Sequence, residues 1–173
     1  MLRVLLDTSV YGELILDSNV LEKTENSVAI SRIRVYGNKI IRNELRDTPK
    51  KIRLGKKRKR ILLLNVYDEL VKRSKHEIPI GKITETLARE YFVRYKRFGG
   101  NLGAGELKND FLIVASASLK ELNIVVSHDT KSMLSEKSKK AYNAVNRENG
   151  LKNPKFIEYK KYKRELNLID SPV

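Results

Sequence analysis

The chain contains no cysteine. This absence excludes disulfides, thiol nucleophiles, iron–sulfur clusters and cysteine-based zinc sites, and it fits a reducing compartment. The chain also has no run of roughly 20 apolar residues, which a membrane-spanning helix would need. An acid, Asp7, follows shortly after Met1, whereas a signal peptide avoids acids near its start. We therefore expect a cytoplasmic protein without a membrane-spanning segment.

Histidine is scarce as well. His76 and His128 are too few and too far apart in the sequence to indicate an imidazole-based ribonuclease. Glycine is concentrated in segment 99–105, but this segment runs into Glu106 and not into the Lys-Ser or Lys-Thr of a phosphate-binding P-loop. Nucleotide binding of the P-loop type is therefore not expected.

Positive charge, in contrast, is abundant. The chain has 36 Lys and Arg against 21 Asp and Glu, a formal net charge of +15, and a pI near 9.9. A polyanionic partner follows from this excess. The densest basic run, residues 50–60, has only Ile52 and Leu54 between its cations, so it lacks the bulky apolar face of a membrane-surface helix. We expect nucleic acid to contact Lys56, Lys57, Arg58, Lys59 and Arg60.

The length suits one domain, residues 1–173, with a basic insertion around 50–60. Apolar runs alternate along the chain with segments of helical periodicity. This alternation predicts an α/β fold, a three-layer α/β/α sandwich with a central parallel sheet of about four to five strands. The expected strands are 2–6, 39–42, 123–127 and 155–159, with a weak edge strand at 76–80. The expected helices are 10–22, 26–36, 58–74, 82–97, 107–122 and 131–148, followed by a short tail helix.

Four acids should converge in such a sheet. Asp7 and Asp129 each follow an apolar strand, and Glu44 comes about two residues after the expected second strand. Asp110 lies in the first turn of the helix that leads to the strand before Asp129. The carboxyl ends of parallel strands meet at one edge, where ligands of open α/β sheets bind. We therefore expect one cluster at that edge.

Four carboxylates held close together raise one another's pKa unless a cation compensates for their charge. Oxygen-only ligands favour Mg²⁺ or Mn²⁺ over zinc or copper. A divalent cation in such a site can activate water and neutralise charge during phosphodiester hydrolysis. The acids therefore predict phosphodiester chemistry, and the net charge by itself predicts only a polyanion.

Each acid also has a structural alternative. Asp7 could cap the helix that follows it, and Asp129 could cap a helix in the same way. Asp110 could be an acid stabilised by the dipole of its helix. Glu44 could be a surface acid paired with Arg46 or with a nearby lysine. Only the presence of all four in one chain favours a common site.

Four sequence segments, taken in order, resemble a known family. They are LLDTSV at the first strand, NEL at Glu44, NDFLIVASA at Asp110 and VVSHD at Asp129. The chain resembles PIN domains, including VapC-type toxins, over nearly its whole length. The resemblance implies a metal-dependent endoribonuclease in which Asp7, Glu44, Asp110 and Asp129 bind Mg²⁺ or Mn²⁺. It further implies supporting hydroxyls at Thr8 and Ser127, and Glu106 is a candidate for an additional acid.

The resemblance implies RNA as the substrate, and it leaves open a small antitoxin protein and a second copy of the chain, in a homodimer, as partners. An alternative is a catalytically silent RNA-binding protein on the same scaffold, acting in ribonucleoprotein assembly or RNA processing. A phosphatase of the haloacid-dehalogenase type is disfavoured, because such enzymes need an acid two residues after the first Asp and this chain has Ser9 there.

Overall fold

The computed structural model describes residues 1–72 and 75–170. Four parallel strands form its central sheet in the order β2-β1-β5-β6. They are β1 (Leu2–Leu6), β2 (Ile33–Tyr36), β5 (Ile124–Ser127) and β6 (Lys155–Glu158). The central strands β1 and β5 carry buried apolar runs, residues 4–6 and 124–126, as strands covered on both faces do. The expected parallel α/β sheet is therefore confirmed.

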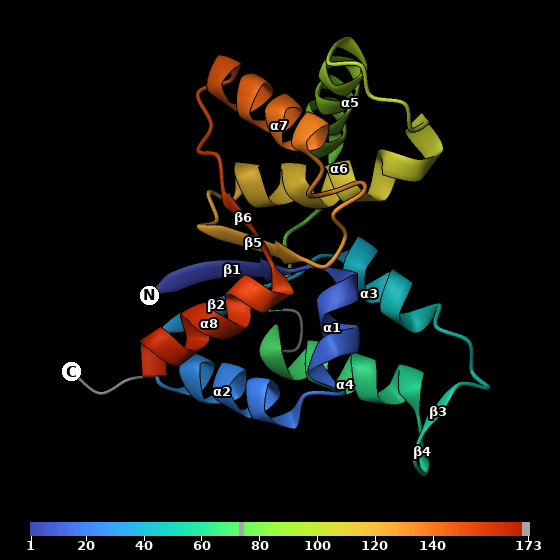
Figure 1. The fold of residues 1–173 in the computed structure, drawn as a ribbon, viewed down its shortest axis with the longest axis vertical. Coiled ribbons are helices and arrows are strands. Elements are labelled where there is room, and N and C mark those ends of the chain that lie inside the picture. The colour runs from blue at the N-terminus through green and yellow to red at the C-terminus, as the bar shows by residue number, and fades with distance from the viewer. Residues whose placement is uncertain (73–74, 171–173) are drawn as a thin grey trace.

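Helices cover both faces of the sheet. In Figure 1, α5, α6 and α7 lie on one side of it, and α1, α2, α4 and α8 lie on the other. Helix α3 contacts α4 and α6. The helices are α1 (Thr8–Leu14), α2 (Ser18–Ala29), α3 (Lys39–Arg46), α4 (Lys59–Leu70), α5 (Lys82–Arg97), α6 (Ala104–Leu119), α7 (Glu136–Glu148) and α8 (Tyr159–Asp170). In the described part of the chain, no helix is long and apolar enough to cross a membrane.

The predicted assignment between residues 30 and 42 is wrong. Helix α2 ends at Ala29, and residues 33–36, expected to be helical, form the second strand. Residues 39–42, expected to be a strand, begin α3 instead. The Asn38 side chain caps this helix by accepting hydrogen bonds from the backbone N–H groups of Ile40 and Ile41. The short apolar run at 39–42 was ambiguous between helix and strand, and the cap decides for helix.

Other boundaries shift less. The expected helix 10–22 is two helices, because α2 begins at a new N-cap, Asp17. Helix α6 begins at Ala104, earlier than expected, and α7 begins only after its N-cap Ser135. The weak edge strand expected at 76–80 is reduced to one parallel bridge between Gly37 and Glu77. The expected helix 82–97 is confirmed as α5. The expected helix 58–74 corresponds to α4, which ends at Leu70, and residues 73 and 74 of this prediction lie outside the described residues.

The basic run forms an exposed antiparallel hairpin of β3 (Arg53–Leu54) and β4 (Lys57–Arg58). Gly55 takes a left-handed conformation, with φ of 59°, in the turn between them. The Arg53 guanidinium donates to the backbone oxygen of Lys56 at 2.7 Å, across the same turn. Figure 1 shows this hairpin extending away from the sheet, between α3 and α4.

Candidate carboxylate site

Asp7 lies at the carboxyl end of β1, in the N-cap position of α1, and is only 6% exposed. Its side chain makes no capping hydrogen bond, so the cap interpretation does not account for it. Instead, its Oδ2 accepts from the Ser127 hydroxyl at 2.8 Å and from the Ser9 hydroxyl at 2.9 Å. Burial raises the pKa of Asp7, although these hydroxyls act to lower it, and the charge of Glu44 raises it further. The carboxylate is thus held in place and costly to ionise.

Asp110 and Asp129 share a hydrogen-bond partner, Ser132. The Ser132 hydroxyl contacts Oδ2 of Asp129 at 2.5 Å and Oδ2 of Asp110. A hydroxyl has one hydrogen and can donate it to only one carboxylate at a time. Asp110 lies near the middle of α6, and Asp129 follows β5. Ser132 therefore ties the helix to the strand at the carboxyl edge of the sheet.

The two acids differ in pKa because their surroundings differ. Burial raises the pKa of Asp110 to about 7, and the charges of Asp7, Asp129 and Glu44 add to the increase against the effect of the Ser132 hydroxyl. Burial also acts to raise the pKa of Asp129, but hydrogen bonds from the Ser132 hydroxyl and from backbone N–H groups outweigh it and lower the pKa. Of these two acids, Asp110 is therefore the one that holds a proton more readily near neutral pH.

Asp129 also caps the turn that follows it. Its Oδ1 accepts from the backbone N–H groups of Lys131 and Ser132, both at 2.9 Å. The expected helix cap is thus wrong, because α7 begins only at Glu136 with Ser135 as its N-cap. Asp129 caps a turn instead and uses only one carboxylate oxygen to do so. The other oxygen, Oδ2, is the one that Ser132 joins to Asp110.

Glu44 reaches the same edge from the last turn of α3, and not from just after a strand as expected. It accepts a hydrogen bond from the Thr8 hydroxyl, and its Oε1 accepts from the Asn109 side-chain nitrogen at 2.6 Å. No salt bridge of the described residues involves Glu44, and Arg46 lies 3.9 Å from Asp47 instead. Thr8 follows Asp7 directly and Asn109 precedes Asp110, so Glu44 contacts neighbours of two other acids.

The donor set fits a hard divalent cation in its chemistry. Its four carboxylates oppose one another's ionisation, which is the condition that a bound cation relieves. As the side chains stand, no group of three or more His, Asp or Glu in residues 1–72 and 75–170 is arranged to hold a metal ion. The carboxylates are turned toward hydroxyls of Ser9, Ser127 and Ser132. Cation binding would require some of these contacts to be exchanged for metal contacts.

The remaining predicted positions divide into two groups. Thr8 and Ser127 donate hydrogen bonds to Glu44 and Asp7, as a supporting hydroxyl would. The Glu106 carboxylate accepts from the backbone N–H of Gly103 at 2.7 Å, which caps α6. Its role as an additional acid stays a prediction.

The sequence interpretation missed Ser9, Ser132 and Asn109. Ser132 follows Asp129 by three residues, the spacing at which a capping acid meets the end of its own turn, so this pattern could have indicated it. Ser9 and Asn109 had no such signal. Asn109 contacts Glu44 of another element, and only the fold shows that the two are close. Ser9 contacts Asp7, two residues before it, and also accepts from the backbone N–H of His128, which only the fold brings near.

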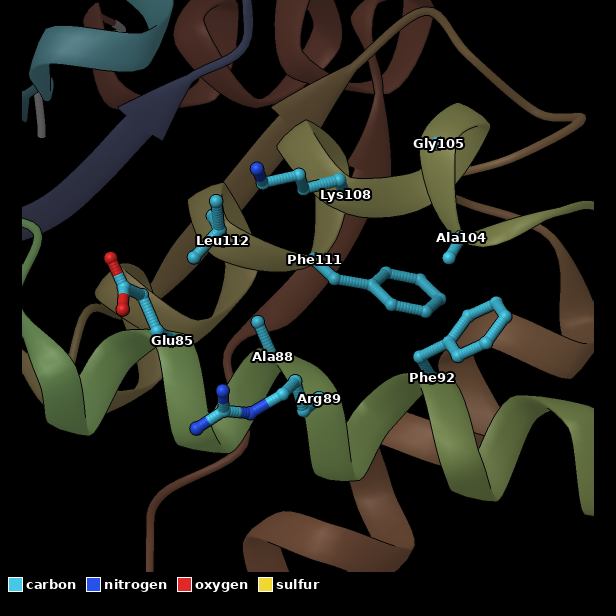
Figure 2. A pocket seen from close by; sticks show the side chains of 9 residues that line it. All are labelled: Glu85, Ala88, Arg89, Phe92, Ala104, Gly105, Lys108, Phe111 and Leu112. Atoms are coloured by element: carbon cyan, nitrogen blue, oxygen red, sulfur yellow. The ribbon is translucent and has the colours of Figure 1, made fainter.

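The basic residues expected to contact nucleic acid lie on a different part of the molecule. Lys56, Lys57 and Arg58 belong to the exposed hairpin, and Lys59 and Arg60 begin α4. A separate groove of about 430 Å³ lies between α5 and α6. Figure 2 shows the rings of Phe92 and Phe111 directed toward one another across this groove, with charged side chains around them. None of the four acids lines the groove, so it is distinct from the carboxylate site.

Two solved structures have a fold similar to that of this chain. The structure of VapBC2 from Rickettsia felis bound to a DNA fragment from its promoter matches with a TM-score of 0.57 and 14% identity, over 91% of this chain and 99% of the matched chain. The structure of FitAB bound to the IR36 DNA fragment matches with a TM-score of 0.50 and 18% identity, over 90% and 94% of the two chains. No protein-family model and no curated protein matches the sequence. VapC and FitB are toxins of the PIN-domain type, so the chain has a PIN-like fold.

Proposed function

We propose that this protein is a metal-dependent endoribonuclease that uses Asp7, Glu44, Asp110 and Asp129. The observation that carries the proposal is the set of hydrogen-bond contacts among the acids: Ser132 joins Asp110 to Asp129, and Glu44 contacts Thr8 and Asn109, the neighbours of Asp7 and Asp110. The pKa of Asp110, raised to about 7 by burial and by the charges of the three other acids, agrees with this arrangement. Acids that oppose one another's ionisation at one edge of a sheet are typical of functional sites. The net charge of +15 supports a polyanionic substrate.

Asp7, Asp110 and Asp129 would hold the Mg²⁺ or Mn²⁺ ion, and Glu44 would complete the site. The bound ion would supply charge neutralisation at the phosphate and an activated water. Ser9 and Ser127 keep the Asp7 carboxylate in one orientation through Oδ2. Asp110 would have to lose its proton for binding, so metal affinity should rise with pH through the neutral range.

The test is cleavage of an unstructured RNA by the purified protein with Mn²⁺ or Mg²⁺. We expect cleavage that leaves 5′-phosphate ends, because a metal-activated water does not use the 2′-hydroxyl. EDTA and Asp7→Asn should each abolish it. Asp47→Asn is a matched control, because Asp47 is an exposed acid outside the cluster. Equal cleavage by the parent protein and Asp7→Asn would refute the four-carboxylate site.

The PIN-like fold favours a more specific role as the toxin of a toxin–antitoxin pair, held inactive by a small protein. Both structures compared above contain such a toxin with its partner. If this role is correct, expression of the chain alone should arrest growth, and Asp7→Asn should relieve the arrest. Growth arrest that persists with Asp7→Asn would separate toxicity from the carboxylates.

The alternative of a catalytically silent RNA-binding protein makes a different prediction. It requires RNA binding that is unaffected by EDTA and no cleavage with either metal at any pH. Binding and cleavage measured on the same labelled RNA distinguish the two functions.

A further inference from the structure

A second concave surface lies beside the edge strand β6. It is a cleft of about 290 Å³, and four of the side chains that line it are cations. They are Lys139 of α7 and Lys160, Lys161 and Arg164 of α8, and Glu158 is the one acid among the lining residues. The cleft is therefore strongly positive, whereas the neighbouring carboxylate site is negative.

The cleft and the carboxylate site begin at neighbouring strand ends. Ser127 at the end of β5 is paired in register with Glu158 at the end of β6. The Ser127 hydroxyl donates to Asp7, whereas Glu158 lines the cleft. On the opposite wall, the Leu134 backbone N–H donates to the backbone oxygen of Asp129 at 2.9 Å. The two sites thus share the carboxyl edge of the sheet, as the positions of α1 and α8 in Figure 1 also indicate.

Three of the cations are not paired in a salt bridge within the described part of the chain. Lys160, Lys161 and Arg164 are exposed, and no salt bridge of the described residues includes them. Their neighbour Lys163 differs, because it pairs with Asp17 at 2.5 Å. Lys160 and Lys161 also lie in the first turn of α8, where the helix dipole disfavours positive charge. An anion bound in the cleft would neutralise these unpaired positive charges and would offset their unfavourable interaction with the helix dipole.

One aromatic side chain, Phe156, lines the same cleft. It is half-buried, and its ring packs on Tyr142 with centroids 5.1 Å apart. Cations that follow a phosphate backbone, combined with an aromatic ring on which a base can stack, are typical of channels for single-stranded nucleic acid. A site for a small anion such as inorganic phosphate would not need the ring.

We propose that this cleft binds the single-stranded RNA that flanks the scissile phosphate, with the backbone along Lys160, Lys161 and Arg164 and an unpaired base on Phe156. The proposal rests on the proposed ribonuclease function for the identity of the polyanion. In this arrangement the single-stranded RNA crosses the carboxyl edge of the sheet, from the carboxylates toward α8. The hairpin of β3 and β4 would then be a second contact and not the principal one.

The experiment measures binding without cleavage. A fluorescein-labelled, unstructured RNA of about 12 nucleotides, a length chosen within the range of known single-strand sites, is titrated in EDTA at several salt concentrations. The test variant is Lys160→Gln/Lys161→Gln/Arg164→Gln. The control variant, Lys82→Gln/Lys120→Gln/Lys152→Gln, removes the same charge from exposed positions that flank the opposite ends of the strands and helices.

For the test variant we expect the slope of log affinity against log salt to fall by about 2, since each phosphate contact on a single strand contributes about 0.7. Affinity at 0.1 M salt should fall on the order of 10- to 100-fold. The control should change both quantities much less. Phe156→Leu, which keeps an apolar side chain against Tyr142, should weaken binding several-fold and leave the salt slope unchanged.

Equal salt slopes for the test and control variants would overturn the proposal. Loss of binding to polyglutamate, with RNA binding equal to that of the control, would also overturn it and assign the cleft to an acidic protein partner. Because EDTA is present throughout, the result does not depend on catalysis. If the test variant loses affinity but the parent protein never cleaves RNA, RNA binding by the cleft is supported and the nuclease function is refuted.

Discussion

At the scale of single residues, Asp110 and Asp129 contact the same hydroxyl but have pKa values shifted in opposite directions. Asp129 accepts two backbone N–H hydrogen bonds that stabilise its charged form. Burial and the negative charges of Asp7, Asp129 and Glu44 disfavour the charged form of Asp110, and only the Ser132 hydroxyl acts in the opposite direction. Of these two acids, Asp110 is therefore the one whose charge disfavours the metal-free fold.

Asp110→Asn should therefore stabilise the metal-free protein at pH 8 and stabilise it less at pH 5. The pKa of this carboxyl is about 7 in the folded protein and 3.8 as a reference. The unfolded chain thus binds fewer protons than the folded one between about pH 4 and 7, and stability falls as pH rises through this window. At pH 8 we expect a gain of about 2 kcal/mol, measured by urea denaturation in EDTA.

Asp129→Asn is the contrasting variant. Its pKa is lowered in the folded protein, so its charge contributes stability above the reference pKa that is lost as pH falls. This variant should be destabilised at pH 8. A stabilisation of equal size in both variants would contradict the assignment of the neutral-range proton to Asp110.

At the scale of elements, α6 is the helix that links the site to the core. Its residues from Phe111 to Ser118 are buried, and its exposed beginning presents Asn109 to Glu44. Gly103 and Glu106 form a capping arrangement at its start. The position of Asp110 therefore depends on where this helix begins.

Glu106 variants test whether this side chain is a cap or an additional acid. Glu106→Gln keeps an oxygen that can accept from Gly103 and should retain cleavage and metal dependence. Glu106→Ala should cost about 1 kcal/mol of stability through loss of the cap. Denaturation and Mn²⁺-dependent cleavage are measured on both variants. A large loss of metal affinity in Glu106→Gln would instead place this acid in the site.

The β3–β4 hairpin is the second element with a specific expectation. Lys56→Ser/Lys57→Ser/Arg58→Ser changes exposed residues only, so the thermal midpoint should stay unchanged. RNA binding should weaken, and its salt slope should fall by about 2 if all three cations contact phosphates of a single strand. An unchanged slope would show that the hairpin does not contact RNA.

At the scale of the whole molecule, metal binding should be visible as thermal stability. A ligand at about 100 times its Kd stabilises the folded state by about 2.7 kcal/mol. For a chain of this size, 1 kcal/mol shifts Tm by about 2 to 4 °C. Saturating Mn²⁺ should therefore raise Tm by roughly 5 to 10 °C at pH 8, measured by differential scanning fluorimetry.

The same measurement at pH 5.5 should show a smaller shift, because the cation must then displace a proton from Asp110. Asp7→Asn should remove most of the shift at pH 8. A Tm shift that is equal in the parent protein and this variant would mean that Mn²⁺ binds elsewhere.

The sequence by itself determined the layer architecture and the candidate acids. Apolar runs such as Leu2–Leu6 are readable as buried strands, and long amphipathic segments such as α5 show helical periodicity directly. Asp7 and Asp129 could be assigned to one edge because each directly follows a parallel strand, a rule that needs no tertiary information.

The tertiary structure decided what short segments become and what the acids contact. Residues 33–36 and 39–42 are too short for periodicity to distinguish strand from helix. Pairing with β1 makes the first segment a strand, and the Asn38 cap makes the second the start of a helix. The partnerships of Ser132 with Asp110 and of Asn109 with Glu44 join residues of different elements. The basic cleft is likewise formed by α7, β6 and α8 together, so no local pattern could reveal it.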